Sequence, residues 1–148
     1  QTLSRIVTRD GPGNFGLLPN GVLCLTDKRA RVIESREFDR TSPDCRYATQ
    51  SGPMLVIGGE LHPRFLPTSS SRFLRNGIGV TTEGMLISAI SNQPVNFHRF
   101  ARLFRDGLET PNALFIDGKV SRLYAPELDR HDFGFPMGAI LGVVVPTD

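Results

Sequence analysis

The sequence has no tryptophan and little cysteine, tyrosine or methionine: two, two and three residues in 148. Long apolar runs are also lacking, because the longest, 138–145, is far shorter than the roughly 20 residues that a membrane-spanning helix needs. We therefore expect no transmembrane segment.

Cys24 and Cys45 cannot form a tetrahedral zinc site by themselves. They fit a disulfide or two buried thiols equally well.

A strong excess of charge of one sign is lacking too. The 17 basic residues stand against 15 acidic ones, which leaves a formal net charge of +2. The bases are spread along the chain and alternate with acids between Arg29 and Arg46. A nucleic-acid surface needs its bases clustered on one face, so no nucleic-acid partner is expected.

The rest of the composition is that of an ordinary globular domain, with 39% apolar and 22% charged residues. Short apolar runs alternate with turn signals supplied by 15 glycines and 11 prolines, a pattern typical of many strands. We predict a single α+β domain over residues 1–148, mainly β-sheet with one helix packed on it. The first dozen residues resemble the middle of a domain, so its N-terminal segment is expected to be missing.

The turn signals divide the chain into expected strands. Asp27-Lys28 and Glu83-Gly84 are predicted to be the turns of two hairpins, and Gly58-Gly59 a third turn. The polar segment 38–44 is expected to be a loop or a short capped turn, and 61–76 an excursion over the surface. The predicted strands cover 22–26, 31–35, 48–57, 79–82, 85–91, 113–116 and 139–145, and the last two can neighbour each other in one sheet.

One segment has the period of an amphipathic helix. Apolar residues recur from Phe97 to Leu108 at spacings of three and four, while charged residues occupy other positions. Asn96 is a suitable N-cap, and Gly107 stands where such a helix would end. The sequence therefore predicts a helix over 96–107.

Two polar stretches carry residues that can bind a ligand. Gln50, Ser51 and Gly52 fall inside an expected strand, where a glycine indicates either a bulge or a close approach of the backbone to a ligand. Arg75-Asn76 precedes another strand, where the arginine can clamp a phosphate or carboxylate or simply be solvated in a turn. From the residues alone, the structural alternative is favoured in both stretches.

Asp117 is the best candidate for a catalytic carboxylate. It directly follows the apolar run 113–116, with Gly118 turning the chain and Ser121 and Arg122 close behind. The end of a buried strand favours functional groups because a rigid element aims them into an open crevice. An ordinary Asp-Gly turn explains these residues equally well. The three histidines share no metal-ligand spacing, and no nucleophile elbow or phosphate-binding loop is present.

Taken in order, several stretches resemble a known family. They are Asn14-Phe15, Leu18-Pro19-Asn20-Gly21-Val22, Ala48-Thr49-Gln50-Ser51-Gly52-Pro53-Met54-Leu55-Val56, Arg75-Asn76-Gly77-Ile78-Gly79-Val80, Phe100-Ala101-Arg102-Leu103-Phe104-Arg105-Asp106 and Asn112-Ala113-Leu114-Phe115-Ile116-Asp117-Gly118. Their order and spacing resemble the phosphodiester glycosidase family, and its bacterial branch more closely than the lysosomal branch. The lysosomal branch, which removes N-acetylglucosamine from a mannose-phosphate diester, has three glycines where this chain has Gly118-Lys119-Val120.

The resemblance implies a mixed α/β fold and a hydrolase that cleaves the bond between a sugar's anomeric carbon and a phosphodiester. The departing phosphate is already a good leaving group, so the enzyme must mainly stabilise charge on it. Arg75 and Arg122 are expected to do so, and Asp117 to act as the nucleophile or as the base that activates water. The resemblance assigns substrate binding to Gln50, Ser51, Gly52, Asn76, Gly118 and Ser121.

The resemblance also implies export to the periplasm or the extracellular space, because bacterial members are typically secreted or lipid-anchored. The expected partner is a sugar-phosphate or glycan substrate. No cofactor is predicted and no metal ligand is assigned, although a divalent metal stays open. The alternative from another class is a catalytically silent glycan-binding or cell-envelope structural domain with the same fold.

Overall fold

The computed structural model describes residues 5–13, 16–118, 121–134 and 140–144. The predicted α+β class, rich in β-sheet, is confirmed. The elements are β1 (Gly21–Leu25), β2 (Ala30–Glu34), α1 (Ser35–Thr41), β3 (Tyr47–Ser51), β4 (Met54–Ile57), β5 (Glu60–Leu61), β6 (Asn76–Val80), β7 (Leu86–Ile90), α2 (Phe97–Arg102), the π-helical turn η2 (Leu103–Gly107), β8 (Asn112–Asp117), β9 (Tyr124–Ala125), the 3-10 turn η3 (Pro126–Leu128) and β10 (Arg130–His131).

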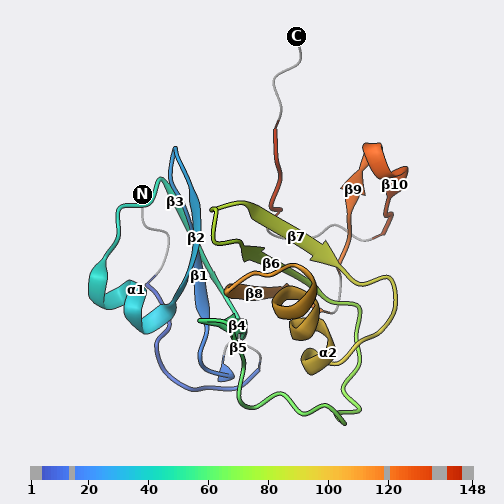
Figure 1. Cartoon of the computed structure of the whole chain (residues 1–148), viewed down its shortest axis with the longest axis horizontal. Coiled ribbons are helices and arrows are strands. Elements are labelled where there is room, and N and C mark those ends of the chain that lie inside the picture. The colour runs from blue at the N-terminus through green and yellow to red at the C-terminus, as the bar shows by residue number, and fades with distance from the viewer. Residues whose placement is uncertain (1–4, 14–15, 119–120, 135–139, 145–148) are drawn as a thin grey trace.

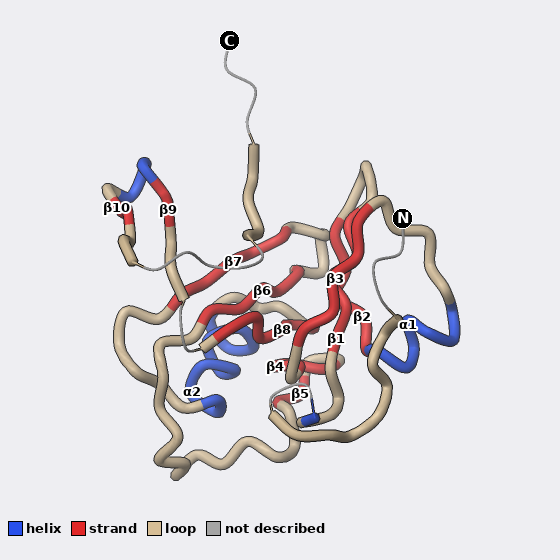
Figure 2. Tube along the Cα trace, turned by 180° about the vertical axis from the view of Figure 1, so that it is seen from behind, coloured by secondary structure: helices blue, strands red, loops and turns tan. Residues whose placement is uncertain are grey.

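The strands form antiparallel sheets (Figures 1 and 2). A five-stranded sheet has the order β5-β4-β8-β6-β7, and a three-stranded sheet has the order β2-β1-β3. The short strands β9 and β10 pair with each other in a hairpin that projects from the rest of the molecule (Figure 1). β8 is therefore the central strand of the larger sheet, and Asp117 is its last residue.

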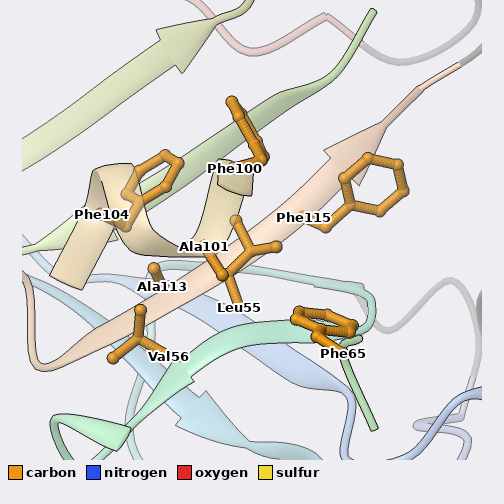
Figure 3. Packing of buried hydrophobic residues seen from close by; sticks show 8 residues of the cluster. All are labelled: Leu55, Val56, Phe65, Phe100, Ala101, Phe104, Ala113 and Phe115. Carbon is orange, nitrogen blue, oxygen red and sulfur yellow. The ribbon is translucent and has the colours of Figure 1, made fainter. Parts of the chain in front are cut away.

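The five-stranded sheet is covered on both faces. On one face, aromatic side chains of α2 and η2 pack on β4 and β8 (Figure 3), in a cluster formed by Leu55, Val56, Phe65, Phe100, Ala101, Phe104, Ala113 and Phe115. On the other face, the three-stranded sheet packs through Leu23, Ala30 and Val32 against Met54, Ile78, Val80 and Leu114. The burial of these apolar side chains supplies the main stabilisation of the layered fold.

Glycines on β6 let the helix approach the sheet closely. A Cβ atom on Gly79 would lie 2.9 Å from Cδ1 of Phe104, and one on Gly77 would lie 3.2 Å from Cε1 of Phe100. Both phenylalanines are buried, so neither ring has free space to move into. The small residues at these two positions are therefore a packing requirement.

The predicted helix over 96–107 is confirmed, with a change of helix type near its end. The side chain of Asn96 caps α2 by accepting a hydrogen bond from the Arg99 amide, at 2.9 Å. The last turn is π-helical, and the Leu108 amide donates to the carbonyl oxygen of Leu103 at 2.9 Å. The expected apolar stripe is the one that packs on the sheet.

Other expectations about the strands need correction. The hairpins β1-β2 and β6-β7 are confirmed, but the turn of the second spans Thr82, Glu83 and Gly84, since the Thr81 amide donates to the Met85 carbonyl. The single strand predicted over 48–57 is wrong. It is two strands, β3 and β4, which part at Gly52-Pro53 and enter different sheets.

Two further predictions need correction. The segment 38–44 is predicted to be a loop or a short capped turn, but its first four residues belong to the helix α1, which begins at Ser35 and ends at Thr41. The Glu34 side chain caps the start of this helix by accepting hydrogen bonds from the amides of Arg36 and Glu37. The strand predicted over 139–145 has no counterpart in 140–144, and its two end residues lie outside the described residues. The neighbours of β8 are β4 and β6.

Cys24 and Cys45 form a disulfide that ties β1 to the segment before β3. Of the two alternatives left open by the sequence, a disulfide or two buried thiols, the structure has the disulfide.

In the described part of the chain, no helix has the length and apolar character needed to cross a membrane.

Candidate functional site

Three segments of the chain meet at the end of β8. From one side, the Ser51 hydroxyl donates a hydrogen bond to the carbonyl oxygen of Ile116, at 3.2 Å. From the other side, Asn76 at the start of β6 is the cross-strand partner of Asp117. The hydroxyl of Ser121 donates to the carbonyl oxygen of Asp117, at 3.2 Å. The strand end is therefore held on both flanks by polar side chains.

A chain of hydrogen bonds links Asn76 and Ser121 to the end of β8. Nδ2 of Asn76 donates to the Ser121 hydroxyl at 3.0 Å, and that hydroxyl in turn donates to Asp117. Oδ1 of Asp117 accepts the Gly118 amide at 2.6 Å, which orients the carboxylate. The structure thus brings together five of the residues that the sequence singled out, namely Ser51, Asn76, Asp117, Gly118 and Ser121. Together with Arg75 we call them the Asp117 cluster.

Arg75 is buried, with 2% of its surface exposed. The central carbon of its guanidinium lies 3.6 Å from the centroid of the Phe97 ring and 5.5 Å from that of Phe115. Nε donates to the carbonyl oxygen of Val95 at 2.9 Å, and Nη2 donates to that of Ser71 at 3.1 Å. Burial lowers the pKa of Arg75 to about 10, so the group stays cationic at neutral pH.

The positive charge of Arg75 lies next to the turn after β8. A Cβ atom on Gly118 would lie 3.5 Å from Nη1 of Arg75 and 2.9 Å from Cζ of Phe115. Among the described residues, no carboxylate forms an ion pair with Arg75. A buried cation of this kind is held by ring faces and carbonyl dipoles, and an anion at the site would add a charge-assisted partner.

Gln50 lies apart from the Asp117 cluster and has its own partners. Its Nε2 donates to the carbonyl oxygen of Val7 at 2.6 Å and to the Ser35 hydroxyl at 2.8 Å, and its Oε1 accepts the Val7 amide at 2.8 Å. The carboxamide of Gln50 therefore bonds to both the amide and the carbonyl of Val7, as the backbone of a neighbouring strand would. Gly52 also has a packing role, because a Cβ atom there would overlap the buried side chain of Asn20.

Arg122 lies at the base of the β9-β10 hairpin. Its guanidinium packs so closely on Gly134 that a Cβ atom there would overlap it. The pKa of Asp132 is lowered, mainly by the hydrogen bond from Arg130, and the positive charge of Arg122 adds to the effect. Arg122 thus follows the cluster in sequence but packs with the hairpin.

A cavity of about 450 Å³ lies on one side of the Asp117 cluster, where Ser51 and Ile116 form part of its wall. It is lined by β1, β3 and residues 140–142. A larger hollow of about 780 Å³ lies at the other end of β8, where Asn112 and the turn at Gly58 line it. No group of three or more His, Cys, Asp or Glu side chains in the described ranges is arranged to hold a metal ion.

Sequence reasoning missed the residues that support the cluster. Phe97, which stacks on Arg75, was visible only as part of the apolar stripe of the helix. The hydroxyl of Ser91 accepts the Arg75 amide at 2.9 Å, and no local pattern marks that serine. The motif residues Asn14, Phe15, Lys119 and Val120 lie outside the described residues.

The chain is thus a β-rich α+β domain with Asp117 at the end of its central strand and a buried arginine beside Gly118. A model of the phosphodiester glycosidase family matches residues 3–136. The chain therefore belongs to this family, and the resemblance seen in its motifs is confirmed.

A relative supports the assignment. Over 114 residues the chain is 34% identical to YigE of Escherichia coli (strain K12), which is described as an uncharacterized protein. The match covers 77% of this chain and 44% of YigE, so the chain spans less than half the length of that relative.

Proposed function

We propose that this chain carries the catalytic residues of a hydrolase that cleaves the bond between a sugar's anomeric carbon and a phosphodiester, releasing the sugar and a phosphomonoester. Family membership supports a hydrolase of this kind. The observation that carries the proposal is the grouping of Asp117, its strand neighbour Asn76 and Ser121 at the end of the central strand, with the buried cation Arg75 beside Gly118.

Asp117 has the two roles open to glycosidase carboxylates. It either attacks the anomeric carbon itself or takes a proton from the water that does so. In both cases the bond from the anomeric carbon to oxygen breaks, and its electron pair leaves on the phosphate oxygen. If Asp117 acts as the base, the attacking water supplies the hydroxyl of the released sugar and its proton passes through Asp117 to solvent. If Asp117 acts as the nucleophile, it forms a glycosyl ester; water then attacks the anomeric carbon, the carboxylate leaves with the electron pair of the ester bond, and the proton of the water goes to solvent.

The phosphate group gains negative charge as this bond breaks, so a nearby cation stabilises the transition state more than the ground state. Arg75 is suited to this role because its charge is already desolvated and held in place, which saves reorganisation during the reaction. Arg122 is proposed as a second phosphate ligand, and Ser51, Asn76 and Ser121 as ligands of sugar hydroxyls or phosphate oxygens. Gln50 would join them only by giving up its hydrogen bonds to Val7.

We further propose that the protein is exported and acts in the periplasm or outside the cell. The disulfide between Cys24 and Cys45 supports this location, because such bonds persist in oxidising compartments and are rare in the cytosol.

Phosphorus NMR tests the proposed reaction. A panel of sugar 1-phosphodiesters is incubated with the full chain, with Asp117→Asn, and with Asp39→Asn as a matched control on the exposed helix α1. The Asn side chain can still accept the Gly118 amide, so the first variant is expected to fold. We expect a phosphomonoester signal from the wild type and from the control, and a loss of at least about a hundredfold in Asp117→Asn. Folded protein that binds these diesters without turning over any of them would favour the silent glycan-binding domain instead.

A further inference from the structure

Three aromatic rings gather on one face of the β9-β10 hairpin. Tyr124 and His131 are cross-strand partners, and their ring centroids lie 5.0 Å apart. The rings of His131 and Phe133 follow at 4.3 Å. Tyr124 is 69% exposed and Phe133 is 82% exposed. We call these three residues the aromatic face.

The hairpin that carries the aromatic face is anchored through polar contacts. Arg130 donates from Nε and Nη2 to the two carboxylate oxygens of Asp132, at 3.0 and 3.1 Å. Oδ2 of Asp132 also accepts the Leu123 amide at 2.9 Å. Nη1 of Arg130 donates to the side chain of Asn92, beyond the end of β7, at 2.6 Å. The bond to Asn92 ties the hairpin to the chain beyond β7, and the other contacts brace the hairpin internally.

The root of the hairpin belongs to the candidate site. Ser121 bonds to Asn76 and Asp117, and the aromatic face begins three residues later at Tyr124. Arg122, the proposed second phosphate ligand, lies between them in sequence. A two-stranded hairpin has no second layer of its own to cover an apolar face. Exposed aromatic side chains that group together are the kind of surface at which proteins bind ligands or partners.

We propose that the aromatic face is a binding surface for the sugar rings of a glycan. This inference rests on the proposed function, which makes a sugar the ligand of the neighbouring site. The faces of aromatic rings carry partial negative charge, and the C–H groups on the flat side of a pyranose carry partial positive charge, so the two stack.

The charge of the hairpin argues against a nucleic acid as the ligand. Residues 121–134 hold Glu127, Asp129 and Asp132 but only two arginines, Arg122 and Arg130. Nucleic-acid stacking platforms lie in positively charged grooves, because the phosphate backbone supplies most of the affinity. A neutral glycan has no such requirement, and hydroxyl groups hydrogen-bond to charged side chains of either sign.

Saturation-transfer NMR on the full chain carrying Asp117→Asn tests this inference without turnover. The probes are chitotetraose, maltotetraose and cellotetraose. We expect magnetisation to pass from aromatic protons to the C–H protons of at least one probe. The affinity for that probe should fall at least about tenfold in Tyr124→Ala and in Phe133→Ala. Leu66→Ala is the control, because Leu66 is also an exposed apolar residue, at 64%, but lies in the loop after β5.

Several results would overturn the inference. The first is that none of the three probes binds. The second is that Leu66→Ala weakens binding as much as Tyr124→Ala does. The third is that Phe133→Ala abolishes a dimer seen by light scattering and leaves glycan binding unchanged. Failure here is distinct from failure of the proposed function. Turnover of simple sugar phosphodiesters without glycan binding removes only this inference, and glycan binding without any turnover removes only the proposed reaction.

Discussion

Replacing Gly79 by alanine tests how the helix packs on the sheet. The added Cβ would lie 2.6 Å from Oγ1 and 2.8 Å from Cβ of Thr110, and 2.9 Å from Cδ1 of Phe104. Thr110 and Phe104 are 1% and 0% exposed, so neither can swing into solvent. The Thr110 hydroxyl also donates to the Phe104 carbonyl at 3.0 Å, and a shift of either residue weakens that bond.

The expected loss combines these two effects. Overpacking a core by one methyl group costs about 1–3 kcal/mol, and the strained hydrogen bond contributes about 1 kcal/mol. We therefore expect Gly79→Ala to lower the free energy of unfolding by about 3 kcal/mol, which lowers the melting temperature by roughly 6–12 °C. Urea and thermal unfolding followed by circular dichroism measure both quantities.

Gly107→Ala is the matched control, because a Cβ atom there meets its nearest neighbour, Cδ1 of Leu103, at an ordinary 3.5 Å. That variant is expected to keep the wild-type stability within about 0.5 kcal/mol. Equal stability of Gly79→Ala and Gly107→Ala would refute the close packing of η2 on β6.

Three further predictions concern the disulfide, a buried histidine and the buried arginine. Reductant should raise the mass of the protein by about two hydrogens, and an unchanged mass would contradict the Cys24–Cys45 bond. This bond closes a loop with a sequence separation of 21, so its loss should lower the free energy of unfolding in urea by about 3 kcal/mol. Burial lowers the pKa of His62, so stability should fall as the pH drops below about 6.5, and His62→Gln should flatten the dependence of the urea midpoint between pH 7 and pH 5. Arg75→Lys should lose about 2 kcal/mol, because an ammonium cannot stack flat on Phe97, and a variant as stable as the wild type would contradict that stacking.

The sequence predicts best where a signal is local. The helix that begins after Asn96 was found because its apolar period and its cap lie within a dozen residues. The strand that ends at Asp117 was found because a short apolar run and a turn define it. In both segments the local preference and the tertiary packing agree.

The predictions failed where length or tertiary contacts decide the structure. The helix α1 is too short and too polar to show a period, and only Ser35 of its residues is buried. The break between β3 and β4 depends on Gly52 approaching Asn20, a contact between distant parts of the sequence. Residues 140–144 are apolar and partly β-branched, which favours a strand, but they have no strand partner in the described structure. Composition indicates that a segment can form a strand and does not specify which segment would pair with it.

The candidate site was predicted as separate stretches, and the structure assembles part of it. Asp117 and Asn76 become neighbours because β8 pairs with β6, and a single sequence does not encode that pairing in any local signal. Gln50 and Arg122 have partners elsewhere, with Val7 and with Gly134. These contacts join parts of the chain that are distant in sequence, so no local pattern predicts them.

The position of bond cleavage tests the central claim most directly. A sugar 1-phosphodiester hydrolysed in water enriched with oxygen-18 is followed by phosphorus NMR, which resolves a phosphate that carries the heavy isotope. If water attacks the anomeric carbon, the label enters the sugar and the phosphomonoester stays unlabelled, and the reaction depends on Asp117. Label in the phosphomonoester would show that water attacks phosphorus, and would contradict a glycosidase reaction at the Asp117 cluster.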